Sequence, residues 1–168
     1  MPVVIDANNM ILGRLATQVA EIILGKKAEV GGIGVDGKPT TVKVQPDDMV
    51  YIINADKCVI TGHPGVTTQR YIQRMHIKTL TNPRRGPFHP RQPEAIVRRA
   101  VRGMIPWKKS NGKEAYRRLR VFVGTPEEAS PSVALILPDA SAADKLAKQI
   151  TVGELARRIS SYAKRVEA

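Results

Sequence analysis

The chain has 168 residues, 42% of them hydrophobic, which is enough to bury a substantial core within one domain. Its 27 Lys and Arg against 15 Asp and Glu give a formal charge of +12, which indicates a polyanionic partner such as nucleic acid. No apolar run approaches the roughly 18 residues that cross a bilayer, and the N-terminus lacks the basic-then-apolar order of a signal peptide, so we expect a cytoplasmic protein with no membrane partner.

The N-terminal region predicts a strand and then a helix. Residues 3–5 are all apolar, as in a short buried strand. A helix begins near Met10, because apolar residues recur at helical spacing as far as Ile23, and Gly25 follows as a C-terminal stop. Three polar side chains just before this helix are expected to cap it: Asp6, Asn8 and Asn9.

Two further strands are predicted in the middle of the chain. Residues 49–53 form a near-continuous apolar run, as expected of a central strand buried on both faces. Residues 57–61 indicate another strand or the edge of one, and Gly62 and Pro64 end it. Strands that alternate with helices predict a layered α/β fold in which helices cover a mainly parallel or mixed sheet.

The glycines at residues 32–37 raise the alternative of a nucleotide-dependent α/β enzyme, because GIGVDGK satisfies G-x-G-x-x-G and nearly satisfies a Walker A loop. Pro39, however, stands where the Walker motif needs Ser or Thr. The residues after it have strand composition, which leaves no helix N-terminus to hold phosphate. Residues 26–46 are therefore expected to form a hairpin insertion that turns at Asp36 and Gly37.

A helix with two unlike faces is predicted from Pro93, which suits a first helical turn. Its apolar stripe comprises Ile96, Val97, Ala100, Val101 and Met104. The opposite face carries Arg98, Arg99 and Arg102. One side is thus expected to face the core and the other to present a row of guanidinium groups. Residues 118–124 then alternate with period two, as in a half-exposed strand with basic outward positions.

The C-terminal part is expected to be a proline-punctuated loop followed by helices. Ser141 can cap a short helix, and Thr151 and Glu154 have capping-box spacing ahead of another apolar stripe. Residues 1–168 are accordingly predicted to form a single domain with a C-terminal helical extension at 141–168.

The excess positive charge is concentrated in residues 70–120, which hold 15 basic and two acidic residues. A solvated surface usually mixes both signs, so this segment is expected to bind a polyanion. Its stretch at 84–93 (RRGPFHPRQP) combines Arg forks for phosphate, Gly for close approach, and Phe88 for stacking on a base. Trp107 is either a further contact or a core anchor. The predicted RNA-binding residues are Arg70, Arg74, Arg84, Arg85, Phe88, Arg91, Arg98, Arg99, Arg102, Lys108, Lys109, Lys113, Arg117 and Arg118.

The sequence gives no positive sign of a metal or catalytic centre. His63, His76 and His89 are expected in separate loops or strands without ligand spacing, and Cys58, the only cysteine, lies in an apolar segment where a thiol is usually inert. We therefore predict no metal, no cofactor, no small-molecule substrate and no enzymatic activity. None of the common sequence-reading RNA modules is present, so recognition of RNA backbone and shape is expected.

Five blocks occur in order along the chain: ILGRLATQVAE, VYIINADKCVITG, RRGPFHPRQP, VRGMIPWKKSNGKEAYRRLRVFVG and ITVGELARRI. They resemble the universal large-subunit ribosomal protein family numbered thirteen, in its archaeal and eukaryotic form. The resemblance implies a three-layer α/β/α domain that binds ribosomal RNA as a structural part of the large subunit, beside neighbouring ribosomal proteins. At matching positions it implies RNA contacts by Arg84, Arg85, Arg98, Arg102, Lys108, Lys109 and Lys113.

The same basic surface would also suit a free translational regulator that binds messenger RNA outside the ribosome. Both kinds of protein need clustered Lys and Arg to neutralise phosphates. The sequence alone leaves this alternative open.

Overall fold

Eight strands and five α-helices lie in the part of the chain that the structure, a computed structural model, describes: residues 2–34, 37–45, 47–126, 134–142 and 148–159. The strands are β1 (Val3–Asp6), β2 (Glu29–Gly34), β3 (Pro39–Lys43), β4 (Val50–Ile53), β5 (Val59–Thr61), β6 (Leu119–Val121), β7 (Leu135–Ile136) and β8 (Gln149–Thr151). The helices are α1 (Leu12–Ile23), α2 (Pro64–His76), α3 (Pro93–Met104), α4 (Ser110–Arg117) and α5 (Val152–Ile159). Short 3-10 helices are η1 (Ala55–Lys57), η2 (Pro83–Arg85) and η4 (Pro138–Ala140).

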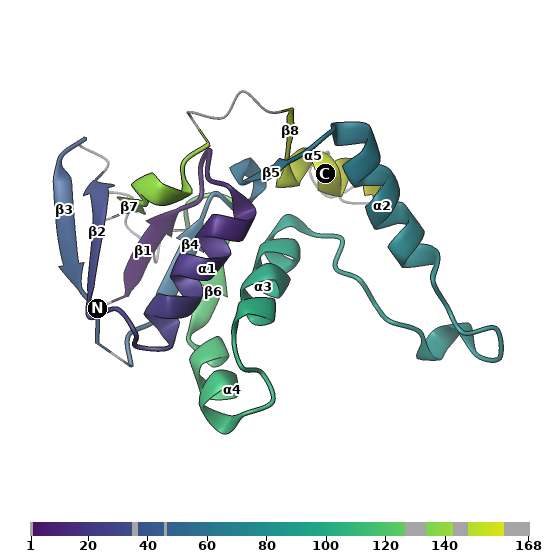
Figure 1. The fold of residues 1–168 in the computed structure, drawn as a ribbon, viewed down its shortest axis with the longest axis horizontal. Coiled ribbons are helices and arrows are strands. Elements are labelled where there is room, and N and C mark those ends of the chain that lie inside the picture. Colours follow the sequence, from purple (N-terminus) through teal and green to yellow (C-terminus); the bar gives the residue numbers. More distant parts are fainter. Residues whose placement is uncertain (1, 35–36, 46, 127–133, 143–147, 160–168) are drawn as a thin grey trace.

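Six of these strands form a central mixed sheet in the order β3-β2-β7-β1-β4-β6 (Figure 1). β1 is parallel to β4 and β7, and β4 is parallel to β6, whereas β2 is antiparallel to β3 and β7. β5 and β8 pair antiparallel in a small second sheet. The fold has the predicted class, a three-layer α/β/α domain with a mixed sheet, a basic loop-rich region and a C-terminal helix.

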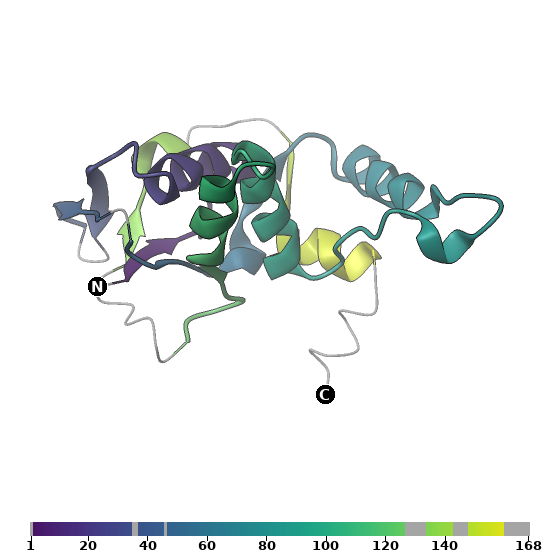
Figure 2. The ribbon, with the colours of Figure 1, turned by 90° about the horizontal axis from the view of Figure 1, so that it is seen from below.

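Helices α1 and α3 lie side by side over one face of the sheet (Figure 2). Leu15 and Val19 of α1, and Val97 and Val101 of α3, are fully buried in the main core. Burial of each such side chain contributes about 1.5–3 kcal/mol, so the apolar stripe holds the opposite, arginine-bearing face of α3 outward. The predicted faces are confirmed except at two residues: Met104, which ends α3, is half exposed, and Arg98 is partly buried.

The start of α1 differs from the prediction. Asp6 Oδ1 accepts hydrogen bonds from the backbone N–H of Asn8 and the side-chain amide of Asn54, both at 2.9 Å, and α1 has no side-chain cap. The predicted capping role of Asp6, Asn8 and Asn9 is wrong, because Asn9 takes a left-handed conformation (φ 53°) and the loop ties β1 to the end of β4 instead. The predicted stop at Gly25 is confirmed by its φ of 69°.

The strand expected at residues 57–61 is shorter than predicted and does not belong to the central sheet. Residues 55–57 form η1, so β5 begins at Val59 and pairs with β8 outside the central sheet. Asn54, directly after β4, takes a left-handed conformation (φ 55°), and this turn carries the chain away from the sheet.

Helix α2 has no counterpart among the predicted elements, because Thr68 is its only buried residue and an apolar stripe is missing. Figures 1 and 2 show α2, η2 and the loops around them projecting from the body of the molecule. We call residues 64–92 the arm. The ring of His63 accepts a hydrogen bond from the Gly65 N–H at the start of α2, and His76 lies within α2 and not in a loop or strand as expected.

Helix α4 was also not predicted, and its start is fixed by close packing. A Cβ on Gly112 would come within 2.2 Å of the Pro106 carbonyl oxygen, so only glycine fits there. At the other end of the chain, Thr151 Oγ1 accepts a hydrogen bond from the Glu154 N–H at 3.2 Å, which confirms the predicted cap of α5. The short helix expected after Ser141 and the chain beyond Ile159 lie outside the described residues. None of the helices in the described ranges is long and apolar enough to span a membrane.

Candidate nucleic-acid interface

Most of the predicted RNA-binding residues lie on the arm, α3 and α4. Lys108 and Lys109 lie in the loop between α3 and α4, and Arg118 directly follows α4. Twelve of the fourteen are exposed: Arg70, Arg74, Arg84, Arg85, Phe88, Arg91, Arg99, Arg102, Lys108, Lys109, Lys113 and Arg117. Arg98 and Arg118 are partly buried. The segment that is most basic in sequence therefore also presents most of its cations on the surface.

Two arginines of α3 are held over aromatic rings that follow it in the chain. The Arg98 guanidinium lies 4.8 Å from the centroid of the Tyr116 ring, and that of Arg102 lies 4.2 Å from the centroid of Trp107. The two rings meet edge to face at 5.0 Å. We call Trp107 and Tyr116 the aromatic platform. Cation–π contacts of this kind contribute about 0.5–2 kcal/mol and orient both arginines, so Trp107 acts mainly as a support.

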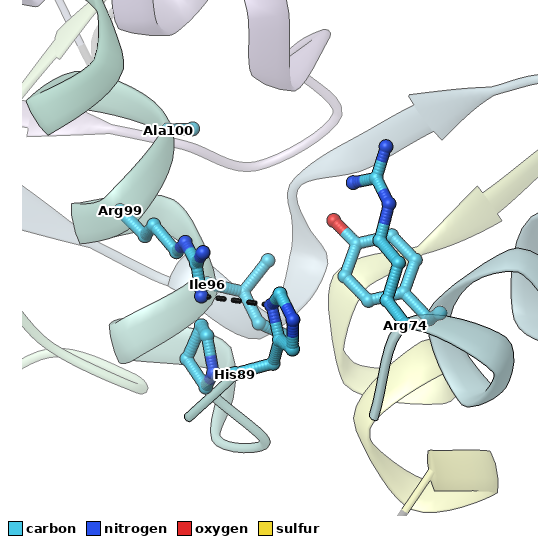
Figure 3. A pocket seen from close by; sticks show the side chains of 7 residues that line it. Arg74, His89, Ile96, Arg99 and Ala100 are labelled. Atoms are coloured by element: carbon cyan, nitrogen blue, oxygen red, sulfur yellow. Dashed lines mark hydrogen bonds between the residues drawn. The ribbon is translucent and has the colours of Figure 1, made fainter. Parts of the chain in front are cut away.

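The loop before α3 is tied to the helix by Arg99. Its Nη1 donates to the Phe88 carbonyl oxygen at 3.3 Å. The same nitrogen donates to His89 Nδ1 at 3.0 Å (Figure 3). Because a guanidinium group only donates, Nδ1 of His89 must be the acceptor and therefore unprotonated. Partial burial, followed by the charges of Arg99 and Arg74, lowers the pKa of His89 below its ordinary value of 6.5.

A small cavity of about 190 Å³ lies between the arm and α3 (Figure 3). Arg74 of α2 lies on one side and Arg99 of α3 on the other, with His89 between them. Tyr71 of α2 also lines the cavity. Among the described residues that line this cavity, none is acidic. Two guanidinium groups and an imidazole around one small space form a setting that favours an anion.

Two larger hollows meet at the exposed ring of Phe88. One, of about 360 Å³, is lined by Lys78, Arg84 and Arg91 of the arm. The other, of about 800 Å³, runs along α3 past Arg98 and Arg102. The structure thus brings the arm and α3 cations together around residues 86–91, whereas Lys113 and Arg117 lie apart on α4.

Arg118 is engaged within the fold. Its Nη2 donates to the Ile23 carbonyl oxygen at 2.9 Å and its Nη1 donates to Asp47 Oδ1 at 3.2 Å. Ile23 ends α1, so a cation here satisfies an orphan carbonyl and opposes the negative end of the helix dipole. Period two in residues 118–124 had placed Arg118 outward, but β6 begins only at Leu119.

The remaining candidate centres offer no comparable arrangement. The thiol of Cys58 is buried and donates to the Met10 carbonyl oxygen at 3.2 Å, and burial raises its pKa to about 12. In the described residues, no three His, Cys, Asp or Glu side chains are grouped as metal ligands. Gly32 and Gly34 lie in β2, and β3 follows from Pro39, so a strand stands where a nucleotide loop requires a helix.

The fold and this surface define an α/β protein that presents a cationic face. The family model described as ribosomal protein L13 matches residues 1–128. The chain is 36% identical to "Large ribosomal subunit protein uL13" of Methanococcus maripaludis over 92% of its length and 95% of that relative. It is 35% identical to the protein of the same name from Methanopyrus kandleri, over 93% of this chain and 85% of the relative. A third protein of that name, from Sulfolobus acidocaldarius, is 36% identical over 92% of this chain and 90% of the relative. The chain belongs to the ribosomal protein L13 family.

Proposed function

We propose that this protein is a structural constituent of the large ribosomal subunit that binds and helps to organise ribosomal RNA through the arm, α3 and α4. The names of its relatives support the place in the subunit. The observation that supports the RNA-binding role is the excess positive charge of residues 70–120, most of which is exposed on the arm, on α3, on the loop after α3 and on α4, with only two acidic residues in the segment. The fourteen residues predicted from the sequence are the proposed contacts, with Arg118 the least available of them.

The proposed mechanism is neutralisation in a fixed geometry. Crowded phosphates repel one another, and Lys and Arg at the surface offset that repulsion while releasing counterions. The buried sheet and helices keep the cations in place, so little ordering is needed upon binding. RNA segments that touch both the arm and the body would in this way be held at a set distance from each other.

The proposed partners are large-subunit ribosomal RNA and neighbouring ribosomal proteins in the cytoplasm. We propose no small-molecule substrate and no catalytic role, in keeping with a family of structural proteins. We also propose that residues 1–168 are one domain, with residues 26–46 as a hairpin insertion and residues 141–168 as a C-terminal extension. The antiparallel pairing of β2 with β3 supports the hairpin.

Sedimentation of a lysate from the native host tests the place in the ribosome. The protein is followed by immunoblot through gradients at low and then moderately high salt. We expect it to comigrate with the large subunit in both. Persistence at the top of both gradients would contradict the proposal, and it would favour a free regulator whose sequence-selective binding to messenger RNA would then be measured.

A further inference from the structure

The hollow of about 800 Å³ beside α3 has a composition that simple phosphate binding does not require. We call it the α3 groove. The residues that line it include Phe88 of the arm, Arg98, Arg102 and Gly103 of α3, and Tyr116 of α4. No acidic side chain is among the described residues that line it. Its size is in the range of pockets that hold small organic molecules.

Phe88 is the unusual member of this groove. Its side chain is 82% exposed, so it contributes little to the core. Its backbone is nonetheless held in place, because Arg99 donates to its carbonyl oxygen and prolines stand at positions 87 and 90. A large apolar ring that is left uncovered on an anchored backbone is suited to stack on a flat partner.

The arginines of α3 supply oriented positive charge to the groove. The aromatic platform holds the guanidinium groups of Arg98 and Arg102, and the Arg98 Nε is buried without a hydrogen-bond partner in the described structure. Gly103 has no side chain to occupy the groove, and the space beside it is open, since a Cβ there would meet nothing within 4 Å. One groove therefore offers a ring face and two oriented guanidinium groups.

We infer that the α3 groove binds an unpaired ribonucleotide, with its base stacked on Phe88 and its phosphates bound by Arg98 and Arg102. The base must be unpaired because a base within a duplex has both faces covered by its neighbours. The inference rests on the proposed RNA-binding function and assigns to one part of that surface a preference for bulges, loops or ends over plain duplex.

The test compares two short RNA hairpins that differ only by one bulged adenosine. Dissociation constants are measured at one fixed salt concentration by fluorescence anisotropy. We expect the wild type to bind the bulged hairpin roughly tenfold more tightly, and Phe88→Ala to remove this preference, because stacking of one base on an aromatic ring is worth about that factor. Phe88→Tyr keeps a ring and should retain most of the preference.

Two further variants separate the groove from general effects. Leu80→Ala removes an apolar side chain that is fully exposed on the same arm but does not line the groove, so the preference should be unchanged. Gly103→Leu fills the groove from the helix, where there is room for a side chain, and should reduce the preference without unfolding the protein.

The outcomes distinguish this inference from the function on which it rests. Equal wild-type affinity for both hairpins, or a Phe88→Ala variant that keeps the preference, overturns the groove while leaving salt-dependent RNA binding intact. Failure of the wild type to bind either RNA at low salt would instead contradict the proposed function itself, and the groove with it.

Discussion

At the scale of single residues, His89 connects the arm to α3 through an interaction that depends on its protonation. Its Nδ1 accepts from Arg99, and this contact is possible only while that nitrogen is unprotonated. The pKa of His89 lies below its ordinary value of 6.5, through partial burial first and then through the charges of Arg99 and Arg74. Between the two pKa values the unfolded chain binds more protons, so this contribution to stability is complete above about pH 6.5 and is lost as the pH falls through the folded-state pKa.

We predict that the imidazole resonances of His89 titrate with a midpoint below 6.5 in an NMR experiment. Arg99→Ala should move that midpoint upward, because it removes a neighbouring positive charge. An anion in the cavity of Figure 3 should have the same effect, since it would favour the protonated ring. A wild-type midpoint at or above 6.5, or one that Arg99→Ala leaves in place, would show that the loop is not held as described.

Among the elements, α3 is the most important for the proposed function, because one of its faces packs in the core and the other bears arginines. Val97 and Val101 are fully buried against the core that includes α1, while Arg98 and Arg102 on the other side rest on the aromatic platform. The helix therefore links the stability of the core to the orientation of the cations that we propose bind RNA.

Changing Val97 and Val101 together to Asp should unfold the domain. Each substitution buries a carboxylate without a partner, at a cost of several kcal/mol, against a total stability of about 5–15 kcal/mol for a typical domain. Circular dichroism and thermal unfolding would report the loss of a cooperative transition. A folded double variant would refute the assignment of this face to the core.

Changing Arg98 and Arg102 together to Ala should leave the fold intact but weaken RNA binding and flatten its salt dependence. Each lost phosphate contact removes up to about 0.9 from the slope of log K against log salt on duplex RNA or DNA. Lys38→Ala with Lys43→Ala is the matched control, because it removes the same charge from the β2–β3 hairpin and should change the slope little. A slope unchanged by the arginine substitutions would mean that this face is turned away from RNA.

The elements that the sequence predicted are those with a strong local pattern. Apolar stripes at helical spacing identified α1 and α3, and continuous apolar runs identified β1 and β4. α2 was not predicted because it buries few side chains. The position of β5 outside the central sheet depends on its pairing with β8, which is distant in the chain. A local sequence pattern could predict neither feature, because α2 lacks a buried apolar face and the β5–β8 pairing is a long-range contact.

The candidate site could be located from the sequence but not resolved into roles. Charge counting placed it in residues 70–120, yet Arg118 is engaged with Ile23 and Asp47 inside the fold. The aromatic platform was also missed, although the spacing of Arg98 and Arg102 by four residues put them on one helix face. Only the fold brings the rings at positions 107 and 116 beneath them.

At the scale of the whole molecule, the charge is distributed asymmetrically. Figures 1 and 2 show the arm extending from one side of the body and the β2–β3 hairpin at the opposite side. Residues 70–120, which include most of the arm and all of α3 and α4, carry the whole of the positive excess, while the rest of the chain is close to neutral. This arrangement suits a protein that is anchored in RNA on one side and leaves its other side for different neighbours.

Ultraviolet crosslinking of purified large subunits, followed by mass spectrometry of RNA-linked peptides, tests this orientation most directly. We predict that the crosslinked peptides of this protein come mainly from residues 70–117, with Phe88 and its neighbours among them. Crosslinks confined to the β2–β3 hairpin or to the region around α5, with none from the arm or α3, would contradict it.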